Sequence, residues 1–407
     1  MNYDVIVVGG GHAGCEAALL SARNKSKTLI ITINLDNIAI MPFGNEIGGA
    51  GNGGLVREIE KLGGEMPENI KRNFISLQRN NSNKDEIKFL VDSRRYSLSL
   101  KKVLERQDNL YLRQGLAVSI RKDGSYLKLK TSDGIVYKGK CIVISTGTFL
   151  GGKIFWGKHG IEAGRQGEIC SKSLLKSLKK MGFVFGVERK YVAPMIDGKT
   201  INTLIMKKQL NLTADEALAV GFGNNSKKRK YSYINNINKV AENYIKGKSK
   251  EIFDGTWNHK INKGGKLSLE ESINDGRILE GREIFIDPVG DSTGEMYLKG
   301  LENALPEDLQ LGMIRKLNGF ERVEMTRPGY GIEYNYLCNS QLNKNLESKK
   351  VDGIFFAGKV NGSEEYEESA AQGVIAGIST SGERIEINDV LSKEGCERIE
   401  AFLSNFF

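Results

Sequence analysis

Residues 4–22 read DVIVVGGGHAGCEAALLSA, and this stretch decides the fold. Asp4–Val8 is mostly β-branched, as expected for a buried parallel strand. Gly9, Gly11 and Gly14 follow it with the spacing G-x-G-x-x-G. The first glycine permits a tight turn, the second lets backbone N–H groups approach a pyrophosphate, and the third lets a helix pack on the strand. The stretch therefore predicts a dinucleotide-binding turn.

The elements that follow the turn fit the same prediction. We expect a helix over 15–24, with its positive end at the phosphates, and a second strand over 28–33. A carboxylate that binds the ribose is expected about 20 residues after the glycines. The sequence has Thr32 and Asn34 there, and Asp36 slightly late. We therefore expect neutral hydrogen bonds to hold the ribose.

Two later stretches are predicted to complete the same pocket. Residues 141–153 read CIVISTGTFLGGK, a buried strand that ends in Thr146, Gly147 and Thr148. Residues 353–377 read GIFFAGKVNGSEEYEESAAQGVIAG, which indicates a strand, a glycine turn and a helix rich in small residues. Together with the first turn, this pattern favours FAD over NAD, because FAD proteins aim a second helix N-terminus at the flavin. The alternative is a separate small α/β unit.

Length and composition indicate a soluble globular protein. The 407 residues are enough for two or three domains, with 40% hydrophobic and 27% charged residues. No apolar run reaches the roughly 18 residues of a membrane helix, and no secretory signal is visible, so we expect a cytoplasmic protein without membrane contact. The five cysteines form no C-x-x-C pair, and the three histidines lack ligand spacing, which argues against a zinc site.

The net charge of +9 favours a polyanionic partner such as RNA. Residues 224–236 and 245–266 mix lysines with Tyr231, Tyr233 and Trp257, a pattern that could grip looped RNA by its phosphates and bases. The alternative for both segments is a solvated lysine-rich loop.

At this point the chain resembles the MnmG (glucose-inhibited division protein A, GidA) family of flavoproteins. The sister group is the TrmFO type of folate-dependent uracil-5 methyltransferases. The resemblance rests on motifs that span most of the chain in the family's order. They are GGGHAGCEAA (9–18), EIGGAGNGGLVREIEKLGG (46–64), STGTFLGGKI (145–154), RPGYGIEYN (327–335) and FFAGKVNGSEEYEESAAQG (355–373).

The resemblance implies an enzyme that binds FAD and modifies RNA uridine at C5, in tRNA or rRNA. Methylenetetrahydrofolate would supply one carbon through the flavin, and NADH or NADPH would supply hydride. It further implies a homodimer and, for MnmG itself, a GTPase partner of the MnmE type. The cofactor contacts implied by the motifs are Gly9, Gly11, His12, Ala13, Gly14, Thr32, Asn34, Gly48, Gly49, Gly51, Arg95, Thr146, Gly147, Thr148, Gly358, Asn361, Glu368 and Ala371.

The chain departs from the family in its substrate-binding segments. Pro42–Gly44 stands where the family has one cysteine, and 274–285 stands where it has another. The family's Lys-Thr-Gly-Thr-Pro-Pro-Arg segment reads KYVAPMI at 190–196, and Glu365 replaces a glycine. The family's C-terminal helical region is expected to be missing after Phe407.

These departures leave the catalytic group open. Cys338 follows RPGYGIEYNYL and is one candidate nucleophile, ahead of Cys170. The alternatives are a carboxylate or tyrosine base at Glu333, Tyr330 or Tyr334, and each of these residues could also be structural. Arg94, beside Arg95, is a further candidate for cofactor or substrate contact.

We therefore expect an α/β protein with a GR2-like Rossmann FAD-binding domain and an inserted mixed α/β domain. The expected divisions are 1–189 for the first part of the FAD domain, 190–285 for the inserted substrate or nicotinamide domain, and 286–407 for the return to the FAD domain with a short closing helix at 388–405.

Three functions remain open. The first is a FAD- and folate-dependent enzyme that modifies RNA uridine at C5, with 5-methyluridine as one of the products considered. The second is a flavin oxidoreductase for a small molecule. The third is a catalytically idle flavoprotein that binds RNA or partners MnmG.

Overall fold

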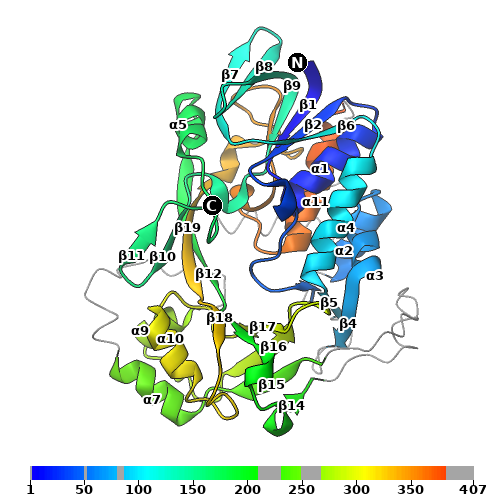
Figure 1. Ribbon diagram of the computed structural model, residues 1–407. Helices are drawn as coiled ribbons and strands as arrows, with labels where there is room; N and C mark the ends of the chain where they lie inside the picture. The colour runs from blue at the N-terminus through cyan, green and yellow to red at the C-terminus, as the bar shows by residue number, and fades with distance from the viewer. Residues whose placement is uncertain (1, 50–52, 80–86, 210–230, 249–266, 382–407) are drawn as a thin grey trace.

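The computed structural model consists of two parts that are joined by long strands. It describes residues 2–49, 53–79, 87–209, 231–248 and 267–381. In Figure 1 a large sheet with its helices forms the upper part, and a second sheet with three helices forms the lower part. The expected closing helix at 388–405 lies outside the described residues.

The first sheet has seven strands and confirms the predicted α/β fold. Its order is β6-β2-β1-β9-β8-β7, and β20 also pairs with β9. Strands β6, β2, β1, β9 and β20 run parallel to one another, whereas β8 pairs antiparallel with both β7 and β9. The strands are β1 (Asn2–Val8), β2 (Thr28–Thr32), β6 (Leu110–Gln114), β7 (Ala117–Asp123), β8 (Tyr126–Thr131), β9 (Val136–Ile144) and β20 (Ile354–Phe356).

Alternate residues of the parallel strands enter two different cores. Val5 and Val7 pack with the helices on one face, whereas Ile6 and Val8 face β7, β8 and the helix α5 (Lys172–Lys180). The helices of the first face are α1 (His12–Arg23), α2 (Gly53–Lys61), α3 (Met66–Asn73), α4 (Ser93–Arg106) and α11 (Tyr366–Ser379). Because both faces are covered, the second half of β1, Val5–Val8, is apolar at every position, as its sequence predicts.

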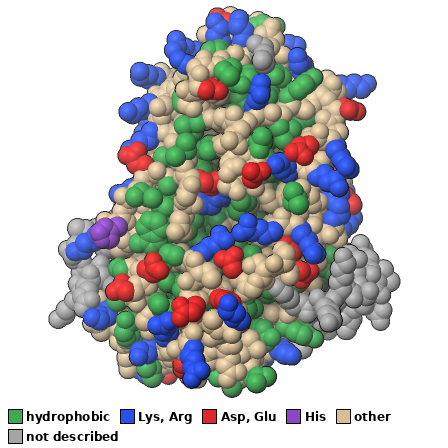
Figure 2. Space-filling view, viewed as in Figure 1, with side chains coloured by type: hydrophobic (Ala, Val, Ile, Leu, Met, Phe, Trp, Pro, Cys, Tyr) green, Lys and Arg blue, Asp and Glu red, His purple; other side chains and the backbone are tan. Residues whose placement is uncertain are grey.

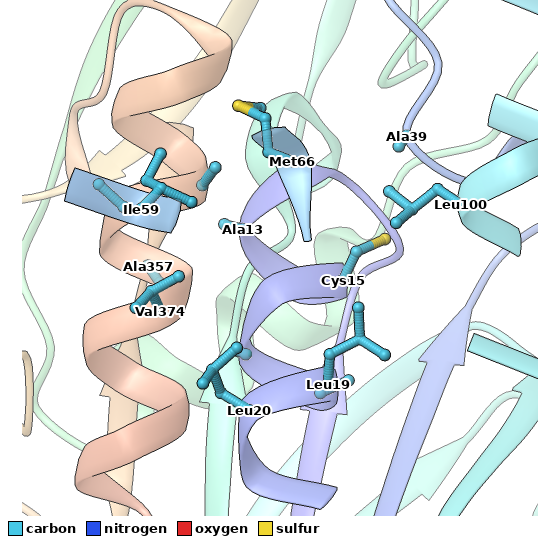
Figure 3. Close-up of a cluster of buried hydrophobic side chains, with 14 of the residues drawn as sticks. Ala13, Cys15, Leu19, Leu20, Ala39, Ile59, Met66, Leu100, Ala357 and Val374 are labelled. Atoms are coloured by element: carbon cyan, nitrogen blue, oxygen red, sulfur yellow. The ribbon is translucent and has the colours of Figure 1, made fainter. Parts of the chain in front are cut away.

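Helices α1 and α11 lie side by side although they come from opposite ends of the chain (Figure 3). A Cβ atom on Gly373 would lie 2.2 Å from the carbonyl oxygen of Ala13, and one on Gly377 would lie 2.7 Å from that of Ala17. Glycine therefore lets the two backbones touch. The predicted FAD-type domain is thus assembled from both ends of the chain.

Two further sheets join the upper part to the lower part. A three-stranded sheet contains β3 (Glu46–Gly48), β5 (Ile87–Val91) and β4 (Phe74–Arg79). A four-stranded sheet contains β11 (His159–Ile161), β10 (Lys153–Trp156), β19 (Tyr330–Leu337) and β12 (Phe185–Val192). Strands β12 and β19 pair over their full length and connect the two parts (Figure 1).

The lower part is built on a six-stranded antiparallel sheet. Its strands, in sheet order, are β14 (Lys207–Lys208), β15 (Tyr233–Asn236), β16 (Glu283–Pro288), β17 (Glu295–Lys299), β13 (Met195–Asp197) and β18 (Met325–Arg327). The helices α7 (Lys239–Gly247), α9 (Leu269–Asn274) and α10 (Glu307–Ile314) complete it. The predicted domain boundary at residue 285 falls inside β16. Strands that precede this residue and strands that follow it pair in the same sheet.

A partly buried ion triad links the lower part to the upper part. The Lys299 ammonium lies 2.8 Å from Asp287 and also contacts Glu46, which belongs to β3. Burial opposes the charge of Lys299, but the two carboxylates outweigh it and raise the pKa of this lysine above its ordinary value. The triad therefore fixes one corner of the joint between the two parts.

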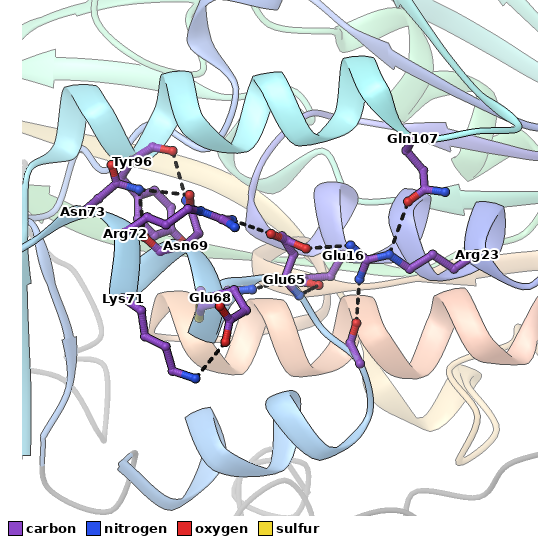
Figure 4. Close-up of polar contacts among 12 residues, drawn as sticks. Glu16, Arg23, Glu65, Glu68, Asn69, Lys71, Arg72, Asn73, Tyr96 and Gln107 are labelled. Atoms are coloured by element: carbon purple, nitrogen blue, oxygen red, sulfur yellow. Dashed lines mark hydrogen bonds and ion pairs between the residues drawn. The ribbon is translucent and has the colours of Figure 1, made fainter. Parts of the chain in front are cut away.

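A second polar network holds α1 against α3 (Figure 4). The buried Glu16 carboxylate accepts hydrogen bonds from the backbone N–H groups of Glu65, at 2.8 Å, and Met66, at 2.6 Å. Glu65 in turn pairs with Arg23 and Arg72. Burial raises the pKa of Glu16 to about 7, although the two N–H donors act in the opposite direction. Glu16 thus satisfies the first N–H groups of α3.

We expect Glu16→Ala to lower the free energy of unfolding by about 3 kcal/mol, because it leaves a cavity and two buried donors without an acceptor. Urea unfolding at pH 5.5 measures this loss. The matched control is Glu60→Ala, whose exposed carboxylate pairs with Lys71 and should contribute less than about 1 kcal/mol. Equal losses in the two variants would contradict the assignment.

The loss caused by Glu16→Ala should shrink as the pH rises. The pKa of about 7 in the folded chain exceeds the ordinary value of about 4.3 in the unfolded chain. A raised carboxyl pKa stabilises the fold at low pH, and that contribution is lost as the pH rises through the folded pKa. The same urea series at pH 5.5 and pH 8 checks the direction.

Candidate functional site

The predicted glycine turn forms the floor of a cavity of about 170 Å³. The walls come from the end of β1, the start of α1, the end of β2 and the segment after β9. The predicted residues that line it are Gly9, Gly11, His12, Ala13, Thr32, Asn34, Thr146, Gly147 and Thr148. The fold therefore brings together three separate segments that were expected to share one pocket.

The three glycines of the turn have different structural roles. Gly9 has φ +116°, and a Cβ atom there would lie 2.3 Å from the carbonyl oxygen of Ser145. At Gly14 a Cβ atom would lie 1.9 Å from the carbonyl oxygen of Gly9. At Gly11 it would meet nothing within 4 Å. Gly9 and Gly14 are thus required by packing, whereas Gly11 leaves room for a ligand above the N-terminus of α1.

Buried polar atoms near the turn lack protein partners. Among the described residues, His12 Nε2, Thr146 Oγ1 and Asn361 Oδ1 are buried without a hydrogen-bond partner. Burial lowers the pKa of His12 to about 3, so its ring is neutral at neutral pH. Buried polar groups are normally hydrogen-bonded, so these atoms fit a site whose partners belong to a bound polar molecule.

The carboxylate nearest the end of β2 in the cavity comes from a distant segment of the chain, at Glu168. Asn34 accepts the backbone N–H of Asp36 at 2.9 Å, and the exposed Asp36 side chain pairs with Lys101. Glu168 lines the cavity instead, where it accepts a 2.5 Å hydrogen bond from the Asn37 amide. Sequence reasoning missed Glu168 because the motif searches only about 20 residues after the glycines, and no local signal marks residue 168.

The remaining predicted cofactor residues lie around the cavity, without lining it. Gly358 packs on Ala13, and Ala371 is buried between α1 and α11. Glu368 accepts the N–H of Glu364 at 2.7 Å and so closes the start of α11. The backbone N–H of Gly48 bonds to Glu367 at 3.1 Å.

Three predicted residues stand apart from this group. Gly49 has φ +105° and faces Lys88, and Gly51 lies outside the described residues. Arg95 lines neither cavity, because its exposed side chain pairs with Asp92 and Asp291.

A second cavity, of about 700 Å³, adjoins the first. It lies between α4, the segment 165–168, and strands of the lower sheet, and it shares Asn34, Asn37, Arg165 and Glu168 with the first cavity. The cations that line it are Arg94, Lys101, Arg165 and Arg327. On the face shown in Figure 2, Lys and Arg side chains gather across the middle of the molecule, where the two parts meet. Three acids also line the second cavity and pair with three of these cations: Asp36 with Lys101, Glu168 with Arg165, and Glu295 with Arg327. Among the described residues, Arg94 is the lining cation without an ion pair, and it can attract an anionic ligand.

Of Cys338, Tyr330 and Glu333, only Tyr330 lines one of the two cavities. Tyr330 lines the second cavity, and burial raises the pKa of its hydroxyl. Glu333 lines neither cavity and pairs with Arg189, at 2.6 Å. Cys338 follows the far end of β19, about 26 Å along the strand from Tyr330, where its N–H bonds to Val184. The roles of these three residues remain predictions.

The other candidate residues are also dispersed. Cys170 is partly buried and lines neither cavity. Tyr334 is buried and bonds to Glu188. Tyr231 is stacked by Lys208, whose ammonium lies 4.4 Å from the ring centroid, but most of the two lysine-rich segments lies outside the described residues. No described group of His, Cys, Asp and Glu side chains could hold a metal ion. None of the described helices has the length and apolarity needed to cross a membrane.

Comparisons with known proteins agree with this geometry. Residues 4–386 match the family model described as glucose inhibited division protein A. Curated relatives include the tRNA uridine 5-carboxymethylaminomethyl modification enzymes MnmG of Pelobacter propionicus, 37% identical, and Clostridium kluyveri, 38% identical. Each alignment covers 93% of this chain and 62% of the relative, so the chain spans about three-fifths of their length.

Solved structures agree with this relationship. GidA of Aquifex aeolicus in its form I crystal has a TM-score of 0.90 and 32% identity, over 100% of this chain and 70% of that chain. The form II crystal has a TM-score of 0.85 and 34% identity, over 93% of this chain and 63% of that chain. On the match over residues 4–386, the chain belongs to the glucose inhibited division protein A family, which is the MnmG family that its motifs predict.

Proposed function

We propose that this chain binds FAD in the first cavity and modifies a uridine of tRNA that enters the second cavity. The observation that carries the proposal is the wall that the two cavities share. A dinucleotide-type cavity built on a glycine turn adjoins a larger polar cavity that is lined by four cations and three acids, so a cofactor and a charged substrate could meet there.

The residues of the first cavity fit FAD. The N–H groups at the Gly9–Gly11 turn and the N-terminus of α1 would hold the pyrophosphate. Thr32, or Glu168 in place of the missing acid, would hold a ribose. When bound, FAD would supply electron transfer and act as a carrier of the one-carbon unit. The unpartnered atoms of His12 and Thr146 would find hydrogen-bond partners on such a ligand.

The second cavity supports the tRNA part of the proposal. Arg94 would contact a phosphate, and Tyr330 would keep its proton at neutral pH and could donate it to a carbonyl of the substrate base. The relatives are named for a 5-carboxymethylaminomethyl modification of tRNA uridine. Their names favour this product over the 5-methyluridine expected from the sister group.

Other parts of the expectation stay predictions. These are methylenetetrahydrofolate, NADH or NADPH, a homodimer and an MnmE-like or MnmG partner. An idle flavoprotein is the second candidate function, because the described residues that line the two cavities include no cysteine. It differs from the first candidate in binding FAD without altering tRNA.

Two glycine variants separate FAD binding from folding. Gly11→Ala should weaken FAD binding at least tenfold with an unchanged melting temperature of the FAD-free protein, since its methyl group meets only the cavity. Gly14→Ala should lower the free energy of unfolding by more than about 2 kcal/mol, because its methyl group overlaps the Gly9 carbonyl. FAD titration and thermal unfolding measure the two effects. Unchanged FAD affinity in Gly11→Ala would place the cofactor elsewhere.

Two neighbouring arginines test the second cavity. Arg94 lines it, whereas Arg95 pairs with Asp92 and Asp291 outside it. We expect Arg94→Ala to weaken tRNA binding about fivefold in a filter-binding assay at fixed salt, because it removes one cation that can contact phosphate. Arg95→Ala should change it less than twofold. The reverse order would exclude this cavity as the tRNA site.

The reaction itself is tested in cells. We expect expression of this chain in a bacterium that lacks MnmG to restore 5-carboxymethylaminomethyluridine in tRNA, as measured by nucleoside mass spectrometry. A gain of 5-methyluridine would instead indicate methylation. Unchanged nucleosides, with FAD bound to the purified protein, would support the idle flavoprotein.

A further inference from the structure

One lysine that the motifs did not single out faces the first cavity. Lys359 lies in the short helix η6 (Gly358–Asn361), which links β20 to the start of α11. Its partly buried side chain lines the cavity together with Phe43, Tyr366 and Ser369. Apart from Phe43, this wall comes from the C-terminal segment of the first domain, whereas the glycine turn belongs to the N-terminal segment. The start of α11 corresponds to the second helix N-terminus that FAD proteins aim at the flavin, so Lys359 would stand on the flavin side of the proposed site.

The Lys359 ammonium makes few polar contacts with the described residues. Among the described residues, its hydrogen bond goes to the carbonyl oxygen of Ser363 at 3.1 Å. It also lies over the rings of Phe43 and Tyr334, 5.6 and 5.5 Å from their centroids. A lysine ammonium has three donors, so this environment leaves capacity for a ligand on the cavity side.

The charged neighbours of Lys359 come from three elements. Lys190 on β12 donates to the carbonyl oxygen of Glu364 at 2.8 Å and also pairs with its carboxylate. Tyr334 on β19 donates to Glu188 on β12 at 2.5 Å, and the Glu188 carboxyl is hydrogen-bonded to Glu364. Glu364 and Glu365 precede α11.

These neighbours oppose each other at Lys359. Burial and the nearby Lys190 lower the pKa of Lys359 to about 8, while Glu364, Glu188 and Glu365 act in the opposite direction. The ammonium is therefore charged at neutral pH and loses its proton near pH 8.

Acidic side chains surround the start of α11. Glu365 caps the helix, and Glu367 and Glu368 stand in its first turn. Burial and the nearby Glu365 together raise the pKa of Glu367 to about 8, so this carboxyl is mostly protonated at neutral pH. Lys359 and Lys190 are the cations placed among these acids. Without them, this wall would repel added negative charge.

We propose that Lys359 presents its ammonium to the isoalloxazine ring of FAD in the first cavity and thereby makes the bound flavin easier to reduce. The inference rests on the proposed FAD site. Hydride from a reduced nicotinamide brings two electrons and one proton to the ring, with the proton at N5, and leaves the flavin with one additional negative charge. A cation beside the ring stabilises that charge and so favours the reduced form.

The test compares flavin reduction in four proteins. Wild type, Lys359→Met, Lys359→Arg and Lys199→Met are loaded with FAD, and each is reduced anaerobically against a reference dye. Lys199 is the matched control, because its side chain is exposed and lines neither cavity. At pH 7 we expect the equilibrium constant for flavin reduction in Lys359→Met to be at least tenfold below that of wild type. This size is typical of removing one nearby charge from a medium with an effective dielectric constant of about 20. Lys359→Arg and Lys199→Met should stay within threefold of wild type.

The pH dependence gives a readout that needs only wild type. The negative charge of the reduced flavin would raise the pKa of Lys359, which is about 8 in the FAD-free chain. Above pH 8, reduction should therefore take up one more proton than it does at pH 7, and the advantage over Lys359→Met should shrink. A purely structural lysine would change stability or FAD affinity without this extra proton.

The outcomes separate the two proposals. A wild-type protein that gains no flavin absorbance on titration with FAD would overturn the proposed function. FAD binding with equal reduction equilibria in wild type and Lys359→Met across pH 6–10 would overturn the inference alone. If Lys359→Met does not fold, the wild-type proton uptake decides: no additional proton above pH 8 overturns the inference.

Discussion

The contact between α1 and α11 is the constraint on which the rest of the structure depends. Two helices whose first residues are more than 350 positions apart touch through their backbones, because Gly373 and Gly377 carry no side chain. This contact places β20 beside β9 and brings η6 to the glycine turn. The chain between β9 and β20 must therefore leave the first sheet and return to it. The lower part is thus an excursion that starts and ends beside the cavity.

The features that were predictable from sequence are those in which one residue type meets a local geometric demand. Gly9 requires a positive φ and Gly14 a close backbone approach, and the apolar run of β1 requires burial on both faces. These demands act within a few residues, so spacing reveals them. The α/β class, the glycine turn and the family all followed from such segments.

The residues that escaped prediction depend on contacts between distant segments. Glu168 reaches the end of β2 across more than 130 positions, and Lys359 acquires its environment from β12 and β19. Arg94 and Arg95 show the same limit at short range. Neighbouring helical residues point about 100° apart, so one lines the second cavity and the other pairs outside it. A motif alone did not distinguish them.

The Lys299 triad has a consequence for how a large substrate can enter. Its three charges belong to both parts of the molecule, and opening this corner would separate Glu46 from Lys299, whose side chain is largely withdrawn from solvent. That corner therefore resists opening more than a hydrated surface contact would. Widening of the second cavity would be easiest as a rotation about this corner, with the paired strands β12 and β19 flexing on the opposite side. The triad would then act as a pivot rather than as a latch.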